Sequence, residues 1–465
     1  MEQTLVVAVD QLESYLAEFT EFAKQAAVDT PPWLRDLRDR AFSRFCEVGF
    51  PTTRDEDWRF TNLSSIVRTQ FKLADGGAIP SKSDLTSWQF ENCAARLVFL
   101  NGQFAPELST RNEMPESIIA TGLRDAIAHH PGAVARHLGR YLNIERDPFC
   151  ALNTAFTADG AYIHVPAKAV VQRPIHLLFV STSGDAPVMT HPRNLIVVEK
   201  EAQVSVVEDY VSFGPEIPTL SNAVTELVAE ENSSVAHTLI EREHQQTYNI
   251  STLRIEQGRS ANVASHSLLL GGALVRNNVH PVLAGEGGEC LINGLFVGNG
   301  RQHLDNYMLV EHASPHCASR QFYNGILDGH SHGVFHGRII VHKDAQKTDA
   351  KQTNRNLLLT DDAQIDTKPQ LEIYADDVKC THGATIGQIE ENALFYLRSR
   401  GIPEIEARQL LLEAFAGECL DRMQPGSARD HAQALIEQYL SKIALTAPAR
   451  ETGHNSPERN WKEVE

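Results

Sequence analysis

The sequence lacks paired cysteines, an excess of basic residues and any long apolar run, and each absence excludes a class of protein. Its seven cysteines are an odd number and no two lie close together, so the chain encodes neither a disulfide framework nor a CxxC metal site. The formal net charge is −18. Such an acidic balance argues against nucleic acid and against an anionic membrane surface as partners.

The N-terminus and the hydropathy pattern indicate a cytoplasmic protein. The first residues have no basic segment and carry Asp10 and Glu13 beside a short apolar run, so they do not form a signal peptide. No apolar stretch approaches the roughly 18 residues that a membrane-spanning helix needs. We therefore expect a cytoplasmic chain, away from membranes, with reduced thiols.

Common enzyme motifs are also missing. The chain has no GxxxxGKS/T loop and no GxSxG elbow, and its glycine-rich run 294–300 lacks the strand–turn–helix context of a dinucleotide site. Asp361 and Asp362 are adjacent, so their side chains point in different directions, unlike the facing acids of a glycosidase.

Helical periodicity occurs near the N-terminus, in the region 1–95. After Pro31 and Pro32, apolar residues recur at spacings of three and four, which puts them on one helix face: Leu34, Leu37, Ala41, Phe45 and Val48. Proline suits the first turn of a helix, and Gly49 followed by Pro51 is a stop signal. The polar, aromatic stretch 51–63 shows no clear period and is interpreted as a connector.

From about residue 96 to residue 387 the residue pattern is typical of β-structure. Short runs rich in Val, Ile, Leu and Thr alternate with turn residues, as at 96–100, 176–180, 194–198, 234–240 and 337–341. Almost nothing between 160 and 385 has a helical period, which disfavours a parallel sheet covered by helices. A sandwich, a barrel or a solenoid remains.

An internal repeat favours the solenoid. The segment 357–367 matches the segment 372–382 at an offset of 15 residues, with Asp361-Asp362 repeated as Asp376-Asp377. This offset suits part of one solenoid coil, with the Asp pairs at the corners. A β-helix is the first expectation and a β-sandwich the second.

The C-terminal region 388–445 is helical again. One amphipathic segment ends at Gly401, a second starts after Pro403, and a third covers about 428–444. The polar stretch 446–465 has little to bury and is predicted to be disordered.

Two groups of side chains could carry chemistry. Eight of the 20 histidines lie between residues 303 and 382, and His330, His332 and His336 would share one face of a strand. Such a cluster could bind metal, or it could be a set of ordinary hydrogen-bonded side chains. Cys380 and His382 are two residues apart and would also face the same way on a strand, where both could ligate iron.

Two ligands do not complete a tetrahedral site, so another chain or sulfide would have to supply the rest. In the alternative reading, the repeat places Cys380 over Ile365 and His382 over Thr367, as ordinary coil residues.

Several long segments resemble the SufB/SufD family of iron–sulfur cluster assembly proteins. The runs 345–359 and 366–387, from Ala345 to Leu359 and from Asp366 to Gly387, are similar to the family core, and 394–403 is similar to its C-terminal helical unit. The stretches 53–59 and 147–154 resemble the SufD branch of that family.

The resemblance implies a mainly β protein with a right-handed parallel β-helix core between N-terminal and C-terminal helical domains. It implies a non-catalytic scaffold that pairs with a SufB-type subunit through the C-terminal end of the β-helix and docks a SufC-type ATPase on its C-terminal helices. In isolation such a chain could form a homodimer through the same end. No cofactor is held permanently, but a transient iron–sulfur cluster is expected at the SufB interface, with contributions from Cys380 and above all His382.

The helix face at Leu411, Leu412 and Phe415 is then expected either to bind the ATPase or to pack on its own neighbours. In the SufB pattern a glutamate stands on each side of the matching histidine, whereas Thr381 and Gly383 stand here, so we expect this chain not to build clusters alone. Two alternatives are a self-contained metalloprotein using the histidines of 303–342 and a β-helix enzyme acting on polysaccharide.

Overall fold

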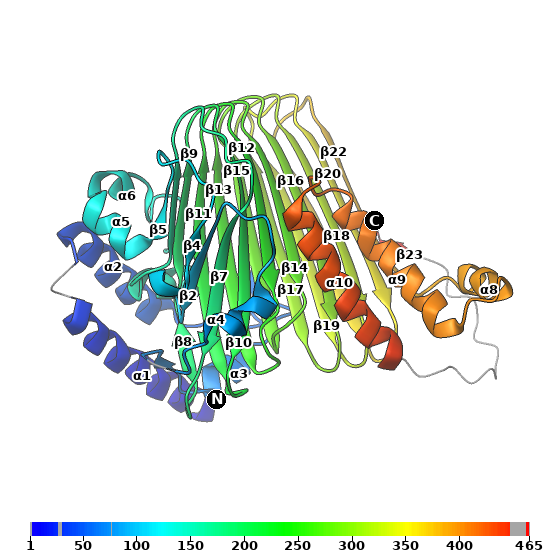
Figure 1. The fold of residues 1–465 in the computed structure, drawn as a ribbon, viewed down its shortest axis with the longest axis horizontal. Coiled ribbons are helices and arrows are strands. Elements are labelled where there is room, and N and C mark those ends of the chain that lie inside the picture. The colour runs from blue at the N-terminus through cyan, green and yellow to red at the C-terminus, as the bar shows by residue number, and fades with distance from the viewer. Residues whose placement is uncertain (1, 27–29, 76, 447–461, 465) are drawn as a thin grey trace.

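Two large sheets of mainly parallel strands form the opposite walls of a β-solenoid (Figure 1). The computed structural model describes residues 2–26, 30–75, 77–446 and 462–464. Between β9 and β22, successive strands alternate between the two sheets, so each strand pairs with the strand one coil before it and the strand one coil after it.

Sheet A has the order β21-β19-β17-β15-β13-β11-β9-β6-β5, with β1 and β8 beside it. Its strands are β1 (Lys72–Leu73), β5 (Ile119–Gly122), β6 (Ala161–Val165), β8 (Val188–Thr190), β9 (Arg193–Val198), β11 (Thr219–Ala229), β13 (Thr247–Gln257), β15 (Leu274–Leu283), β17 (His303–His312), β19 (His332–Val341) and β21 (Gln364–Ile373).

Sheet B has the order β23-β22-β20-β18-β16-β14-β12-β10-β7-β2-β3, with β4 beside β2. Its strands are β2 (Ala95–Leu100), β3 (Gln103–Phe104), β4 (Thr110–Arg111), β7 (Ile175–Thr182), β10 (Gln203–Phe213), β12 (Ser234–Glu241), β14 (Asn262–Leu269), β16 (Glu289–Gly298), β18 (Ala318–Leu327), β20 (Asp349–Leu358), β22 (Lys379–Gly387) and β23 (Lys462–Val464).

The register shows that the 15-residue repeat is half a coil. Asp349 of β20 lies beside Lys379 of β22, 30 residues later. The Asp pairs at 361–362 and 376–377 lie in the turns between strands, as predicted. Cys380 therefore does not stack over Ile365, nor His382 over Thr367, because residues 15 apart belong to opposite sheets.

The main core fills the lumen between the sheets. Alternate residues of each strand point inward, so the lumen is lined by apolar columns that run from coil to coil. Phe104 and Ala120 pack against this core at its N-terminal end, while Ile365, Leu371 and Cys380 pack against it at the other end.

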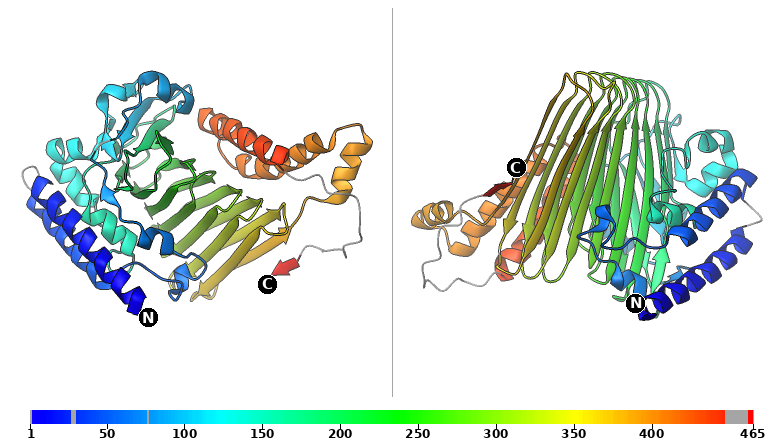
Figure 2. Two further views of the ribbon diagram at one scale, coloured as in Figure 1. Left: turned by 90° about the horizontal axis from the view of Figure 1, so that it is seen from below. Right: turned by 180° about the vertical axis from the view of Figure 1, so that it is seen from behind.

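Helices gather at the N-terminal end of the solenoid (Figures 1 and 2). They are α1 (Glu2–Ala26), α2 (Pro32–Val48), η1 (Glu56–Trp58), α3 (Ser64–Arg68), α4 (Lys82–Leu85), η2 (Thr86–Trp88), η3 (Pro106–Leu108), α5 (Leu123–His129), α6 (Pro131–His137) and α7 (Pro148–Ala155). The helix expected after the proline pair is confirmed: Pro32 opens α2, and Gly49 follows its end with a φ of 65° and donates its N–H to Phe45 O at 2.8 Å. Aromatic residues of α1, α2 and α7 form a second core on the outer face of sheet A.

The C-terminal helices are α8 (Glu391–Ser399), α9 (Glu404–Leu420) and α10 (Ser427–Thr446). Apolar residues of α9 and α10 cover the outer face of sheet B, and Figure 2 shows this pair lying along the side of the solenoid. The mainly β fold with a parallel β-helix between helical regions is thus confirmed. Three helices, α5 to α7, lie inside the stretch 96–387, and most of the tail 446–465 lies outside the described residues.

Within the part of the chain that the structure describes, no helix combines the length and the apolar character that crossing a bilayer requires.

Candidate functional site

Among the described residues, only β23 pairs with the last coil at the C-terminal end of the solenoid, so most of this end is open. Every residue of β21 is at least partly exposed, whereas most residues of β19, one coil earlier in the same sheet, are buried. In the opposite wall, β22 is similarly exposed except at Ala384. The last coil therefore presents lumen residues that in every inner coil are covered by the next one, and such a surface favours a partner.

Cys380 and His382 lie in this last coil. Cys380 is beside Ala350 and His382 beside Gln352 of the preceding coil. Cys380 is half-buried against the lumen core, and His382, two residues on, leaves the strand on the same side and is exposed. The prediction that the two residues share one face of a strand is confirmed.

The Cys380 thiol is held in its protonated form more firmly than an exposed thiol would be, since burial raises its pKa. The thiolate is the form that binds metal. Cys380 therefore also serves as a small apolar residue at the end of the core.

Among the described residues, the backbone around His382 has a strand partner on one side only. The outer edge of β22 pairs antiparallel with β23, but only over Ala384–Ile386. Among the described residues, the stretch Lys379–Gly383 has a strand partner only in β20. A β-strand of another chain could therefore pair beside the Cys-x-His segment.

The residues that flank His382 leave β22 on its opposite face. Thr381 and Gly383 are both exposed, and a Cβ added at Gly383 would meet open space. The glycine is therefore not required by packing. Because side chains alternate along a strand, glutamates at these two positions would not project on the lumen side with His382.

The histidines of 303–342 do not converge on one site. His332 Nε2 lies 2.8 Å from Asp366 Oδ2, and His336 Nε2 lies 2.9 Å from Gln370 Oε1. His330 is in the turn before β19 and does not share the strand face with them, which corrects that part of the expectation. Over the described ranges, no three His, Cys, Asp or Glu side chains are arranged to hold a metal ion.

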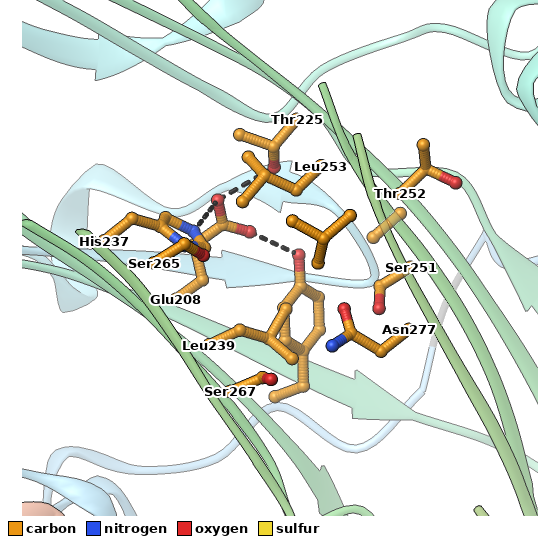
Figure 3. A pocket seen from close by; sticks show the side chains of 13 residues that line it. Glu208, Thr225, His237, Leu239, Ser251, Thr252, Leu253, Ser265, Ser267 and Asn277 are labelled. Carbon is orange, nitrogen blue, oxygen red and sulfur yellow. Dashed lines mark hydrogen bonds and ion pairs between the residues drawn. The ribbon is translucent and has the colours of Figure 1, made fainter. Parts of the chain in front are cut away.

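An enclosed polar pocket lies in the lumen between β10 and β15, in the early coils (Figure 3). Glu208 Oε1 accepts from Thr225 Oγ1 at 2.8 Å and lies 3.2 Å from His237 Nε2, and Tyr210 Oη donates to Glu208 Oε2 at 2.9 Å. Burial would raise the pKa of Glu208, but His237 and the hydroxyl donors outweigh it and lower that pKa. Both carboxylate oxygens have donors, so this is a satisfied structural cluster, remote from β22.

A second buried charge cluster joins sheet B to α10. Asp209 is buried on sheet B, and Arg242 donates to it from Nε at 2.9 Å and from Nη2 at 2.6 Å. His176 Nε2 and His431 Nε2, the latter from α10, lie 3.5 and 3.8 Å from Asp209 Oδ2. Phe90 stacks on His431, with the ring centroids 4.8 Å apart.

Sequence reasoning did not identify this Asp209 cluster. The only signal was a set of charged residues, at 208–209 and 241–243, inside runs that otherwise read as strands.

The C-terminal helix face turns toward the solenoid. Leu412 is 1% exposed and Phe415 is 7% exposed, both packed on apolar residues of β16, β18 and β20, while Leu411 is half-buried. Leu412 and Phe415 therefore pack on their own neighbours, the second outcome expected for this face, and offer no free surface. The exposed apolar residues of α8 and α9, named here the helix patch, are Phe395, Tyr396, Ile405 and Leu410.

Known proteins resemble this chain over nearly all of its length. Residues 179–415 match the family model of the SufBD core domain of the SUF system of FeS cluster assembly, and residues 9–177 match that of the SufBD protein N-terminal region. An iron–sulfur cluster assembly SufBD family protein of Synechocystis is 37% identical over 410 residues, covering 87% of this chain and 90% of the relative.

Two relatives are named iron–sulfur cluster assembly protein SufD. The protein of Escherichia coli is 32% identical over 84% of this chain and 90% of its own length. The protein of Bacillus subtilis is 25% identical over 93% of this chain and 98% of its own length.

Proposed function

Because this chain belongs to the SufB/SufD family of the SUF system of iron–sulfur cluster assembly, we propose that it is the SufD-type scaffold subunit of a SufB–SufC–SufD complex. Its role is to help assemble nascent clusters, which the complex hands to carriers, without an active site of its own. The observation that carries this proposal is the open last coil, formed by β21 and β22.

The open coil is the surface for a SufB-type partner. A second solenoid end would cover the half-exposed lumen residues Ile365, Leu371 and Cys380 and could pair with the free edge at Lys379–Gly383. In the absence of that partner, a second copy of this chain would cover the same apolar residues, which gives a homodimer.

The cluster is cargo, built where the two subunits meet. His382, with Cys380 beside it, supplies an imidazole and a thiol at the rim of the open coil. The described residues near them add no third ligand, so SufB and sulfide complete the site. No cofactor stays on this subunit, and ATP hydrolysis belongs to the SufC-type partner.

The test is cluster yield from co-expressed subunits. Replacing His382 with Ala should leave assembly of the complex unchanged but reduce its cluster content at least tenfold, because an essential ligand is lost. The yield is measured from iron and acid-labile sulfide per complex, after size-exclusion chromatography has shown that the complex is intact.

A matched control for this test is His330→Ala. His330 is exposed at a turn of the preceding coil, and its imidazole Nδ1 lies 3.7 Å from Asp362 Oδ2. Its replacement should leave the yield near wild type. If an intact His382→Ala complex carries as many clusters as wild type, this subunit has only a structural role in the complex.

The helix patch is the docking surface for the SufC-type ATPase. Exposed aromatic residues are frequent centres of binding energy, and Phe395 is 73% exposed. Replacing Phe395 with Asp should weaken ATPase capture about 30-fold, since an aromatic anchor contributes about 2 kcal/mol or more. The measurement is a pull-down titration of the ATPase on the folded variant.

The control for the patch is Ile79→Asp. Ile79 is also a large, exposed apolar residue, at 76%, but it lies in the N-terminal region. The Ile79→Asp protein should capture the ATPase as strongly as wild type. Equal capture by the Phe395→Asp and wild-type proteins would show that the ATPase does not dock on α8.

We assign the complex to the cytoplasm, where thiols stay reduced. All seven cysteines of this chain are unpaired, which suits a reducing compartment. The self-contained metalloprotein and the polysaccharide-acting enzyme are disfavoured by the family membership.

A further inference from the structure

A buried pair of glutamine side chains lies next to His382 on the lumen side of sheet B. Gln321, Gln352 and His382 occupy the same register position in three consecutive strands of sheet B, β18, β20 and β22. Gln352 Nε2 donates to Gln321 Oε1 at 2.8 Å. The two glutamines are 2% and 1% exposed, so this bond lies inside the lumen.

The amide of Gln352 is left with one acceptor unused. Its Nε2 is committed to Gln321, and among the described residues no group donates to its buried Oε1. An unpaired buried acceptor costs about 1–3 kcal/mol, so such atoms normally have a partner. The next side chain along this column, toward the open end, is His382.

The fold makes room for this amide. Gly337, in the opposite wall on β19, faces Gln352, and a Cβ added there would come within 1.7 Å of Gln352 Nε2. Any other residue at 337 would displace the amide. The side-chain amide of Gln352 is therefore held in place by its hydrogen bond to Gln321, and it fits because Gly337 has no Cβ.

We infer that Gln352 is a positioning residue for His382: the exposed ring of His382 turns toward the unused Oε1 of Gln352, which accepts a hydrogen bond from one ring nitrogen and leaves the other nitrogen as the free electron pair for iron. Neighbouring parallel strands lie about 4.8 Å apart, within reach of an imidazole that leans toward the preceding coil. Histidines that ligate metals commonly donate their second ring N–H to such an acceptor. This inference rests on the proposed role of His382.

The first test does not depend on cluster assembly. In the isolated chain labelled with ¹⁵N-histidine, long-range ¹H–¹⁵N spectra at about pH 8, where ordinary imidazoles are neutral, report which ring nitrogen carries the proton. The His382 signals are identified by their loss in His382→Ala. Wild type should show one protonated nitrogen, and Gln352→Leu should shift the ring toward an exchange-averaged mixture of tautomers.

The matched control is Gln321→Leu. It breaks the same amide–amide bond and leaves a similar orphan group, but it keeps Oε1 of Gln352 beside His382. It should leave the His382 signals as in wild type. If Gln352→Leu also leaves them unchanged, or if both variants shift them equally, the inference is overturned.

The second test measures cluster yield in the co-expressed complex. Gln352→Leu should lower the yield about tenfold, the size usual for loss of a residue that orients a metal ligand, and Gln321→Leu should change it little. Equal losses in the two variants would show that the amide pair supports only the fold. If Gln352→Leu shifts the His382 signals while His382→Ala assembles clusters normally, the proposed role of His382 fails and the hydrogen bond stands.

Discussion

The variant Phe415→Asp is expected to lose about 5 kcal/mol of stability or more and to release α9 from sheet B. Phe415 is 7% exposed in the core that α9 and α10 share with the outer face of sheet B. Truncating a buried Phe alone costs about 3–5 kcal/mol, and burying a carboxylate in its place adds a desolvation penalty. Arg355, the nearest cation over the ring, is already paired with Glu418.

Urea denaturation followed by fluorescence and circular dichroism measures this loss. Leu410→Asp is the control: it lies on the same helix but is 46% exposed, so its stability should change by less than about 0.5 kcal/mol. Loss of ATPase capture in Phe415→Asp would then report unfolding, whereas its loss in Leu410→Asp would report docking. A Phe415→Asp protein as stable as wild type would contradict the packing described for α9.

The variant Asp209→Ala is expected to lose about 3–5 kcal/mol, because it leaves the buried guanidinium of Arg242 without its counter-charge. Arg242, whose side chain is 8% exposed, would lose both hydrogen bonds to the carboxylate. Burial alone would raise the pKa of Asp209, but the guanidinium of Arg242 outweighs it and holds that pKa well below its usual range. Removing one partner of such a buried pair is far more damaging than removing one partner of an exposed pair.

The matching exposed pair is Lys347 with Asp377, whose side chains are 56% and 64% exposed. Asp377→Ala should change the free energy of unfolding by less than about 1 kcal/mol in the same denaturation experiment. Asp209→Ala should also free α10 for limited proteolysis, since His431 of α10 loses the carboxylate near it. Similar stabilities for the two variants would show that the Asp209 cluster contributes no more than a surface pair.

Local patterns were enough to predict many elements of this fold, although the short helices α5, α6 and α7 lie in a stretch that was expected to be β-structure. The helix after Pro31, the helices that flank Gly401 and the strands with runs of β-branched residues all formed where the sequence indicated them. Such patterns depend on residues within a few positions of each other, so one chain segment carries the whole signal. The same holds for Cys380 and His382, whose shared strand face follows from their spacing of two.

The repeat was read correctly as a solenoid feature but not as half a coil. One coil takes 27 residues between Asn262 and Glu289 and 31 between Ala318 and Asp349. Because the corners differ in length, no fixed period runs through the sequence, and the stacking partner of a residue cannot be counted off. The contacts between stacked coils decided that Cys380 lies on Ala350.

The sequence by itself determined the class of fold, the family and the Cys-x-His pair, because each is written in neighbouring residues. Only the tertiary structure decided which end of the solenoid is open, which side of α9 faces inward and which residues meet across long separations. Asp209 and His431 are joined by the docking of α10, and Gln352 and His382 by one turn of the solenoid. These contacts follow from coil length and helix docking, which depend on packing over the whole molecule.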